Sequence, residues 1–283
     1  MTEPSPQQPP EQPLDGLGEL ADLATLRVSG RPGGVVLVTL DQPERRNAMT
    51  EAMTAEWSRV MAALRSAPGV RVVVLTGAGS AFCSGGDISW IGAEPDASVD
   101  RLRDRMLTFY WTWLAVRDLE VPTVAAVNGP AVGAGLALAL ACDLRYAAED
   151  ARLAVPFTSL GMHPGMATTY LLREAVGPAV ARELLLTGRS VTGAEGVALG
   201  LVNGAYPAAE VLDRTLDVAG SIAAAAPVAT RLTKRTLAAD RPAGFAETLR
   251  QEALAQAVTL ATEDLQEGLA AQRERRAARF SGR

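Results

Sequence analysis

The chain has 283 residues, of which 48% are hydrophobic and 21% are charged, and its formal net charge is −5. This is the composition of an ordinary globular protein with a full-sized core, and the acidic balance argues against a nucleic-acid-binding surface. With one histidine, His163, and two cysteines, Cys83 and Cys142, neither a structural zinc site nor a disulfide framework is expected.

The sequence carries no signal for a membrane or for export. The longest apolar stretch, residues 131–142, is too short to span a bilayer and contains glycines. The N-terminus has acidic residues and prolines where a signal peptide has basic residues followed by an apolar run. We therefore expect a cytoplasmic protein that binds no membrane and no nucleic acid.

The first half of the chain alternates β-type runs with helical patterns. Residues 24–29 and 34–40 are short β-type runs separated by glycines and a proline, which predicts a hairpin. Thr50 then caps a predicted helix that reaches about residue 66 and has apolar residues on one face. The apolar, β-branched run 70–76 predicts a buried strand that ends in a glycine-rich turn.

The same order of elements recurs further along the chain. A helical pattern over 99–117 precedes a second apolar strand over 122–128 and a second glycine-rich turn. A buried helix over 133–141 and a strand over 143–147 follow. The repetition of strand, turn and helix predicts an α/β core in which helices cover a sheet.

The rest of the chain is helical in pattern. Helices are expected near 166–176, 178–186 and 193–199, and residues 208–280 fit alanine-rich amphipathic helices almost throughout. We therefore divide the chain into three parts by composition and pattern. These are a disordered, Pro/Gln/Glu-rich tail over 1–18, an α/β core over 19–207 and a helical C-terminal region over 208–283.

Two segments place glycines where a buried strand ends and a helix begins, namely residues 77–88 (GAGSAFCSGGDI) and 127–136 (VNGPAVGAGL). The N–H groups of a first helical turn lack intrahelical partners, and the helix dipole adds positive charge there. Two such turns facing one another would form an oxyanion hole from main-chain donors alone.

These two segments resemble the signature motifs of the crotonase (enoyl-CoA hydratase/isomerase) superfamily. Residues 41–48 (DQPERRNA) and 186–202 (LTGRSVTGAEGVALGLV) are similar to two further motifs of that family. The resemblance covers residues 24–280. It implies an α/β fold with a ββα spiral core and a helical C-terminal region that assembles homotrimers or dimers of trimers.

The resemblance also implies a site for an acyl-CoA thioester, with the backbone N–H groups of Gly86 and Ala134 as the oxyanion donors. It implies no metal and no redox cofactor, because coenzyme A enters as part of the substrate. The residues assigned to coenzyme A or to the acyl group are Arg45, Arg46, Ala48, Ala81, Cys83, Ser84, Gly85, Asp87, Ile88, Trp90, Gly133, Ala137, Phe157 and Arg275. Arg275 would act from a C-terminal helix of the same or a neighbouring subunit.

Two positions depart from the family's hydratases, which use two glutamates as acid and base. The corresponding residues are Ala137 and Phe157, and neither side chain can transfer a proton. Loss of acid–base help costs on the order of 10² to 10⁴ in rate per group. The sequence therefore predicts a thioester site without the usual pair that activates water.

Other groups could supply a proton. His163 lies on the loop expected to line the acyl pocket, and an imidazole can act as acid or base near neutral pH. The alternative is a loop histidine bonded to backbone beside Pro164. Weaker candidates are the hydroxyls of three loop residues and the carboxylates of a predicted lid after Trp90, namely Thr158, Ser159, Thr168, Glu94, Asp96 and Asp100.

Three further residues of the motifs have a structural interpretation. Asp87 and Asp143 are expected to cap or anchor local structure. Cys83 has no histidine nearby in sequence to generate a thiolate, so a core thiol is favoured over a nucleophile.

Two function hypotheses follow. The first is an acyl-CoA enzyme that stabilises an enolate or oxyanion and catalyses isomerisation, decarboxylation, hydrolysis or hydration. The second is a non-catalytic acyl-CoA carrier or sensor, favoured by the loss of both carboxylates at Ala137 and Phe157.

Overall fold

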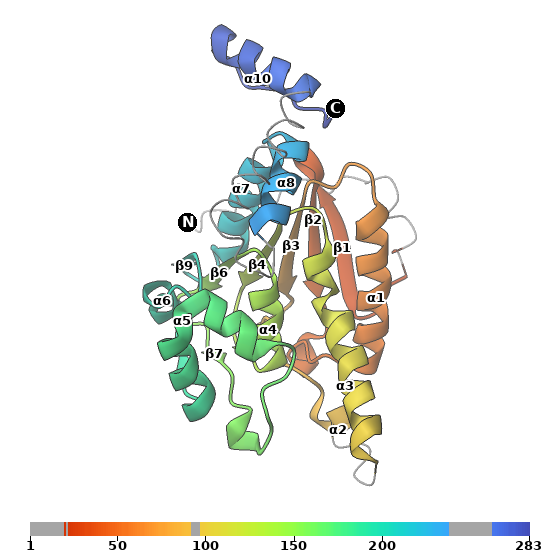
Figure 1. The fold of residues 1–283 in the computed structure, drawn as a ribbon, viewed down its shortest axis with the longest axis vertical. Helices are drawn as coiled ribbons and strands as arrows, with labels where there is room; N and C mark the ends of the chain where they lie inside the picture. Colours follow the sequence, from red (N-terminus) through yellow and green to blue (C-terminus); the bar gives the residue numbers. More distant parts are fainter. Residues whose placement is uncertain (1–19, 21, 92–96, 238–261) are drawn as a thin grey trace, which may run out of the picture.

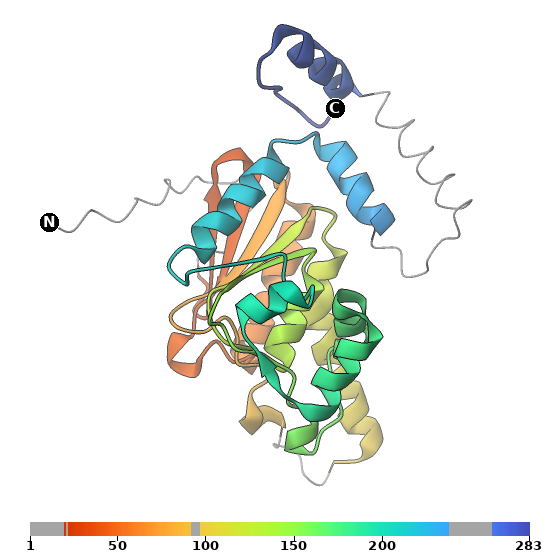
Figure 2. The same cartoon turned by 90° about the vertical axis from the view of Figure 1, so that its left-hand side faces the viewer.

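The computed structural model describes residue 20 and residues 22–91, 97–237 and 262–283 (Figures 1 and 2). The tail predicted over 1–18, the lid carboxylates Glu94 and Asp96, and residues 238–261 of the expected C-terminal helices lie outside the described residues. No helix in the described part of the chain is both long and apolar enough to cross a membrane.

A six-stranded sheet forms the centre of the molecule. Its first two strands form the predicted antiparallel hairpin, and every other neighbouring pair is parallel. β3 and β4 are buried along their whole length because helices cover the sheet, which is why their sequences are continuously apolar. The strands, in their order across the sheet, are β1 (Leu26–Arg31), β2 (Val35–Leu40), β3 (Val72–Gly77), β4 (Thr123–Val127), β6 (Leu144–Ala148) and β9 (Gly204–Tyr206).

A second, three-stranded sheet lies beside the first. It consists of two-residue strands, β5 (Ala131–Val132), β7 (Leu153–Ala154) and β8 (Ser190–Val191). Strands of this length have too few residues to show an alternating pattern, so the sequence analysis missed them. β5 leads directly into α4 (Ala134–Ala141), and the small sheet thereby fixes the start of that helix.

Helices cover both faces of the large sheet. Figure 2 shows α7 (Val211–Ala223) on one side and α1 (Glu51–Ser66), α3 (Val99–Leu114) and α4 on the other. α1 begins as predicted, with the Thr50 hydroxyl accepting the N–H of Met53 at 3.2 Å. α7 belongs to the predicted C-terminal region, and it packs against β2, β3, β4 and β6 of the core.

The remaining helices are α2 (Ile88–Ile91), α5 (Thr168–Thr187), α6 (Gly193–Ala198), α8 (Pro227–Leu237) and α10 (Glu263–Glu274). Of these, α5 and α6 lie where helices were predicted, α8 and α10 lie in the region predicted to be helical, and α2 was not predicted as a separate helix. α5 spans both helices predicted over 166–186. The break between them appears as Gly177, whose φ of 73° interrupts the helix one residue before Pro178.

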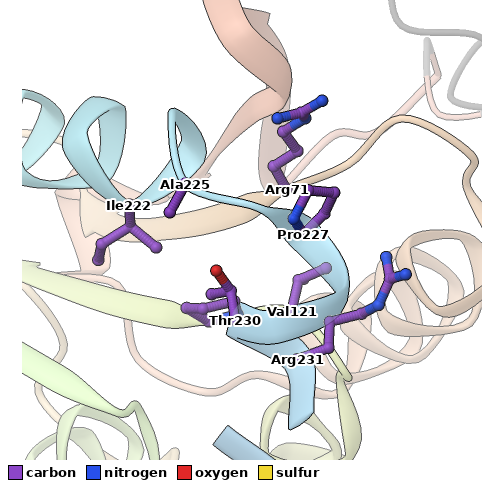
Figure 3. Close-up of a pocket in the computed structure, with 8 residues that line it drawn as sticks. Arg71, Val121, Ile222, Ala225, Pro227, Thr230 and Arg231 are labelled. Carbon is purple, nitrogen blue, oxygen red and sulfur yellow. The ribbon is translucent and has the colours of Figure 1, made fainter. Parts of the chain in front are cut away.

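The junction between α7 and α8 is held to the sheet by two basic side chains. The Arg71 guanidinium donates to the carbonyl of Ala223 at 3.0 Å and to that of Phe280 in the C-terminal segment. Lys234 of α8 donates to the Asp143 carboxylate at 2.9 Å and to the Val121 carbonyl at 2.8 Å. A cavity of about 10 Å³ lies beside this junction, which is room for about one water molecule and for no substrate. Figure 3 shows the residues that line it.

The first strand is anchored to α1 through a single carboxylate. Glu56 accepts the N–H groups of Ala24, Thr25 and Leu26 at 2.8, 2.8 and 3.1 Å, and the Thr25 hydroxyl at 2.6 Å. Burial alone would raise the pKa of Glu56, but these four donors lower it below its ordinary value. The ionised carboxylate therefore stabilises the fold.

We predict that Glu56→Ala lowers the free energy of unfolding by about 1–3 kcal/mol at pH 7, because several backbone donors lose their acceptor. Since the folded-state pKa is depressed, this contribution is present above the ordinary value of 4.5 and is lost as the pH falls through the folded-state value. Urea denaturation at pH 7 and pH 3 measures both effects. The control Glu51→Ala, at the exposed start of the same helix, should cost less than about 1 kcal/mol. Equal losses at both pH values would contradict the prediction.

Candidate functional site

The two glycine-rich turns meet through their backbones. The carbonyl of Pro130 accepts the N–H groups of Phe82 and Cys83 at 3.1 and 3.2 Å, and the carbonyl of Cys83 accepts the N–H of Val132 at 3.0 Å. These bonds hold residues 82–83 beside residues 130–132, although the two segments are nearly fifty positions apart in sequence. The structure thus brings together the two turns that the sequence motifs single out.

Glycine is required at this contact because the chains approach so closely. A Cβ on Gly135 would lie closer than 3.0 Å to the carbonyl oxygen of Cys83. Gly85 has a φ of +99°, and a Cβ there would lie 2.6 Å from the Val132 carbonyl oxygen and 3.4 Å from the Ala134 nitrogen. Gly85, the residue before Gly86, therefore packs directly against the start of α4 at Ala134.

Both N–H groups are free to bind a ligand. In the described part of the chain, no hydrogen bond is donated by the N–H of Gly86 or of Ala134. Ala134 is the first residue of α4, and Gly133 before it provides no side-chain cap. The helix dipole adds partial positive charge at the Ala134 end, and such unpartnered N–H groups attract a negatively polarised oxygen.

The segment predicted to bind coenzyme A lies against the first turn. The Arg46 carbonyl accepts the N–H of Ser84 at 3.0 Å, and the Met49 N–H donates to the Gly85 carbonyl at 2.8 Å. Arg45 forms an ion pair with Asp87 at 3.0 Å. Residues 45–48 and 81–87 are therefore adjacent, as their assignment to one binding site requires. Ala48 and Ser84 are half-buried, and Arg46 is exposed.

Two asparagines hold the first turn in place, and the sequence analysis assigned neither a role. The buried Asn47 amide donates to the carbonyls of Ala78 and Ala81 at 3.0 and 2.8 Å, and its oxygen accepts the Gln42 N–H at 2.9 Å. The Asn128 side chain accepts the Gly77 N–H at 3.1 Å and donates to the Gly79 carbonyl at 3.0 Å. Both residues fall inside the motifs, so the motif match was the available signal.

The carboxylates of the two motif aspartates, Asp87 and Asp143, are hydrogen-bonded or ion-paired to other residues of the chain. Asp87 accepts the Ser89 hydroxyl at 2.7 Å and the Ser89 N–H at 3.0 Å, and the Ser89 hydroxyl is the main cause that lowers the pKa of Asp87. Asp143 accepts the Thr123 N–H at 2.7 Å and pairs with Lys234. These contacts support the structural interpretation of both carboxylates.

The two cysteines are core thiols. Cys83 and Cys142 are buried, and burial is the main cause that raises the pKa of each thiol to about 12. A thiol of that kind is protonated at neutral pH and is a poor nucleophile. The interpretation of Cys83 as a core residue rather than a nucleophile is therefore confirmed.

The two positions that the family resemblance assigns to the glutamates of hydratases, Ala137 and Phe157, lie next to the second turn. Ala137 is fully buried in the first turn of α4, where its N–H donates to the Gly133 carbonyl at 3.1 Å. The half-buried Phe157 ring lies against Gly133, since a Cβ on that glycine would be 3.6 Å from Cζ of the ring. A methyl and a phenyl group thus flank the turn that carries the Ala134 N–H.

The candidate replacements for the glutamates are placed differently. His163 is exposed, with Nδ1 at 2.8 Å from the Pro164 carbonyl oxygen, which is the arrangement of the alternative interpretation. The Thr158 and Thr168 hydroxyls donate to the backbone carbonyls of Leu185 and Gly165. Ser159 and Asp100 are exposed. The catalytic role of His163 stays a prediction.

Two predicted binding residues lie at opposite ends of the molecule. Trp90 of α2 is half-buried, packs against the tilted ring of Phe109 at 5.0 Å between ring centroids, and carries the Arg105 guanidinium over its ring at 3.9 Å. Arg275 follows α10, which Figures 1 and 2 show far from α2. Within one chain Arg275 therefore does not join the site, and contact from a neighbouring subunit stays a prediction. Ile88 begins α2, directly after the first turn.

The described residues bring no three His, Cys, Asp or Glu side chains close enough together to hold a metal ion. What the structure presents is a pair of unpartnered backbone N–H groups between two apolar turns. Unpartnered backbone N–H groups are the kind of donor with which enzymes can stabilise a negative charge on a carbonyl oxygen.

Comparisons with known proteins give the family. The model of the enoyl-CoA hydratase/isomerase family matches residues 30–283. A Thermus thermophilus protein named "Putative enoyl-CoA hydratase" is 40% identical over 248 residues, with coverage of 88% of this chain and 98% of that protein. The 2,3-dehydroadipyl-CoA hydratase of Escherichia coli is 32% identical over 258 residues, covering 90% and 98%.

The structural comparison agrees. The crystal structure of an enoyl-CoA hydratase from Bacillus anthracis superposes with a TM-score of 0.86 at 31% identity, covering 92% of this chain and all of that one. The chain therefore belongs to the enoyl-CoA hydratase/isomerase family and has the crotonase fold, as the motifs predicted.

We predict that Gly135→Ala destabilises the protein by about 1–3 kcal/mol, because the new methyl group would collide with the Cys83 carbonyl and force the two turns apart. Thermal unfolding measures the effect. The matched control is Gly220→Ala at an exposed position of α7, where a Cβ meets nothing within 4 Å and alanine should stabilise the helix by about 0.5–1 kcal/mol. Similar changes in both variants would show that the turns are not in close contact.

Proposed function

We propose that this protein is an enzyme that binds an acyl-CoA thioester and stabilises negative charge on the thioester oxygen with the N–H groups of Gly86 and Ala134. The observation that carries the proposal is that these two donors are unpartnered and lie on turns packed against each other. Removing one oxyanion donor from an acyl-transfer site costs on the order of 10² to 10³ in rate, so such a pair supplies a large part of the catalysis.

Coenzyme A would enter as part of the substrate and lie along residues 45–48 and 81–87, which the structure places side by side. The proposed chemistry uses no metal and no redox cofactor. Assembly as a homotrimer or dimer of trimers and a cytoplasmic location remain expectations from the family resemblance and from the sequence.

Hydration by a glutamate pair does not fit the residues beside the second turn, since Ala137 and Phe157 cannot move protons. Decarboxylation fits them better. When a 2-carboxyacyl thioester loses CO₂, the C–C bond breaks and its electron pair forms the enolate, so no base is needed. The two N–H groups stabilise the enolate oxygen, and a proton from water or from His163 then reaches the α-carbon.

A second candidate function is a non-catalytic acyl-CoA carrier or sensor. The observation that favours it is the same pair of residues, because Ala137 and Phe157 leave only apolar groups beside the thioester site. Such a protein would keep the binding turns and would have lost the chemistry.

We predict that the wild type hydrates crotonyl-CoA poorly, and that the double variant Ala137→Glu with Phe157→Glu raises this rate by about 10² or more, since two acid–base groups are restored. Loss of the absorbance of the conjugated thioester measures the rate. The single variants are the controls, and circular dichroism verifies that each variant is folded. If hydration stays absent in a folded double variant, the two positions do not face the substrate.

We predict turnover of a 2-carboxyacyl-CoA such as methylmalonyl-CoA, measured as release of CO₂. If His163 delivers the proton, His163→Ala lowers kcat by about 10², whereas Ser221→Ala, an exposed change on α7, leaves it unaltered. Tight thioester binding without turnover of any acyl-CoA would instead establish the carrier.

A further inference from the structure

Two segments of the chain extend from the turns that carry the unpartnered N–H groups, and we call them the two walls of the acyl site. One begins at the second turn, where the Phe157 ring lies against Gly133, and continues as the loop from Phe157 to Gly165. The other begins at the first turn, passes through α2 with Trp90, and continues to α3, where Trp90 packs against Phe109. An acyl group held by the thioester oxygen would lie between these walls.

The two walls meet at Tyr110 of α3. Its ring lies so close to Gly165 that an added Cβ there would sit 2.9 Å from Cζ of the ring and closer than 3.0 Å to the hydroxyl. Not even a methyl group fits between the helix and the loop at this point. Tyr110 is half-buried and packs edge-on against Phe109, at 6.2 Å between centroids, so its ring is held from both sides.

The loop is fixed where it touches the tyrosine. Gly165 is buried, and its carbonyl accepts both the N–H and the hydroxyl of Thr168. The next two residues, Met166 and Ala167, have φ angles of 51° and 52°, a left-handed conformation that non-glycine residues rarely adopt. Such strain costs of order 1–3 kcal/mol per residue and persists only where the surroundings enforce it, typically at functional sites.

We propose that Tyr110 closes the acyl end of the site and restricts the substrate to short acyl groups. This inference rests on the proposed function, because it takes the space between the two walls as the acyl site. The tyrosine hydroxyl has no hydrogen-bond partner among the described residues, and burial raises the pKa of the phenol, so the group that faces the end of the acyl chain is neutral.

The test is a set of binding measurements by calorimetry with butanoyl-, octanoyl- and dodecanoyl-CoA, and with free coenzyme A as reference. The wild type should bind butanoyl-CoA at least about tenfold more tightly than dodecanoyl-CoA, since a full pocket rejects added methylene groups by such factors. Tyr110→Ala should tighten dodecanoyl-CoA by about tenfold and leave free coenzyme A unchanged. Tyr110→Phe keeps the ring and should retain the wild-type profile.

Trp111→Ala, at the neighbouring position on α3 where the side chain is 72% exposed, is the matched control and should also retain the wild-type profile. Should Tyr110→Ala fail to fold, Tyr110→Leu opens part of the same space and should shift the profile in the same direction. Equal binding of butanoyl- and dodecanoyl-CoA by the wild type, or an unchanged profile in the folded alanine or leucine variant, would overturn the inference and leave the proposed function intact. A Tyr110→Phe variant that binds the thioesters like Tyr110→Ala would also overturn the inference, since the ring would then not be the barrier. If the wild type binds none of the thioesters, the proposed function fails and this inference with it.

Discussion

The site depends on one close approach of two backbones, in which the Cys83 carbonyl accepts the Val132 N–H while Gly135 lies under the same carbonyl. β3 and β4 are neighbouring parallel strands, so the turns that follow them lie at the same end of the sheet. The backbone hydrogen bonds between the turns are donated by Phe82, Cys83 and Val132, and the N–H groups of Gly86 and Ala134 take no part in them. The donors are therefore a by-product of how the turns pack, and no side chain has to be placed for them.

The side chains beside the two N–H groups determine which reactions the proposed site can support. Ala137 and Phe157 make the space beside the second turn apolar, and a low-dielectric environment strengthens the attraction between N–H groups and a charged oxygen. Neither of these two side chains can activate water. An arrangement of this kind favours a reaction that creates its own negative charge over one that needs a base.

Most of the core could be predicted from the sequence because its signals are local. The continuous apolar runs of β3 and β4, the Thr50 cap and the break at Gly177 each depend on a few adjacent residues. The strands β5, β7 and β8 could not be predicted, since two residues show no period. For the site, motifs identified the two turns. The contact between Tyr110 and Gly165 joins residues 55 positions apart that no local pattern connects, and only the folded chain reveals it.

The position of Lys234 affects whether a thioester ligand can react with a lysine side chain of the protein. It is the chain's sole lysine, its side chain is 9% exposed, and the Asp143 carboxylate and the Val121 carbonyl hold its ammonium group. Thioesters acylate accessible amines. Because the one lysine of the chain is almost fully buried and bonded to Asp143 and Val121, the protein presents no exposed lysine side chain to an acyl-CoA thioester.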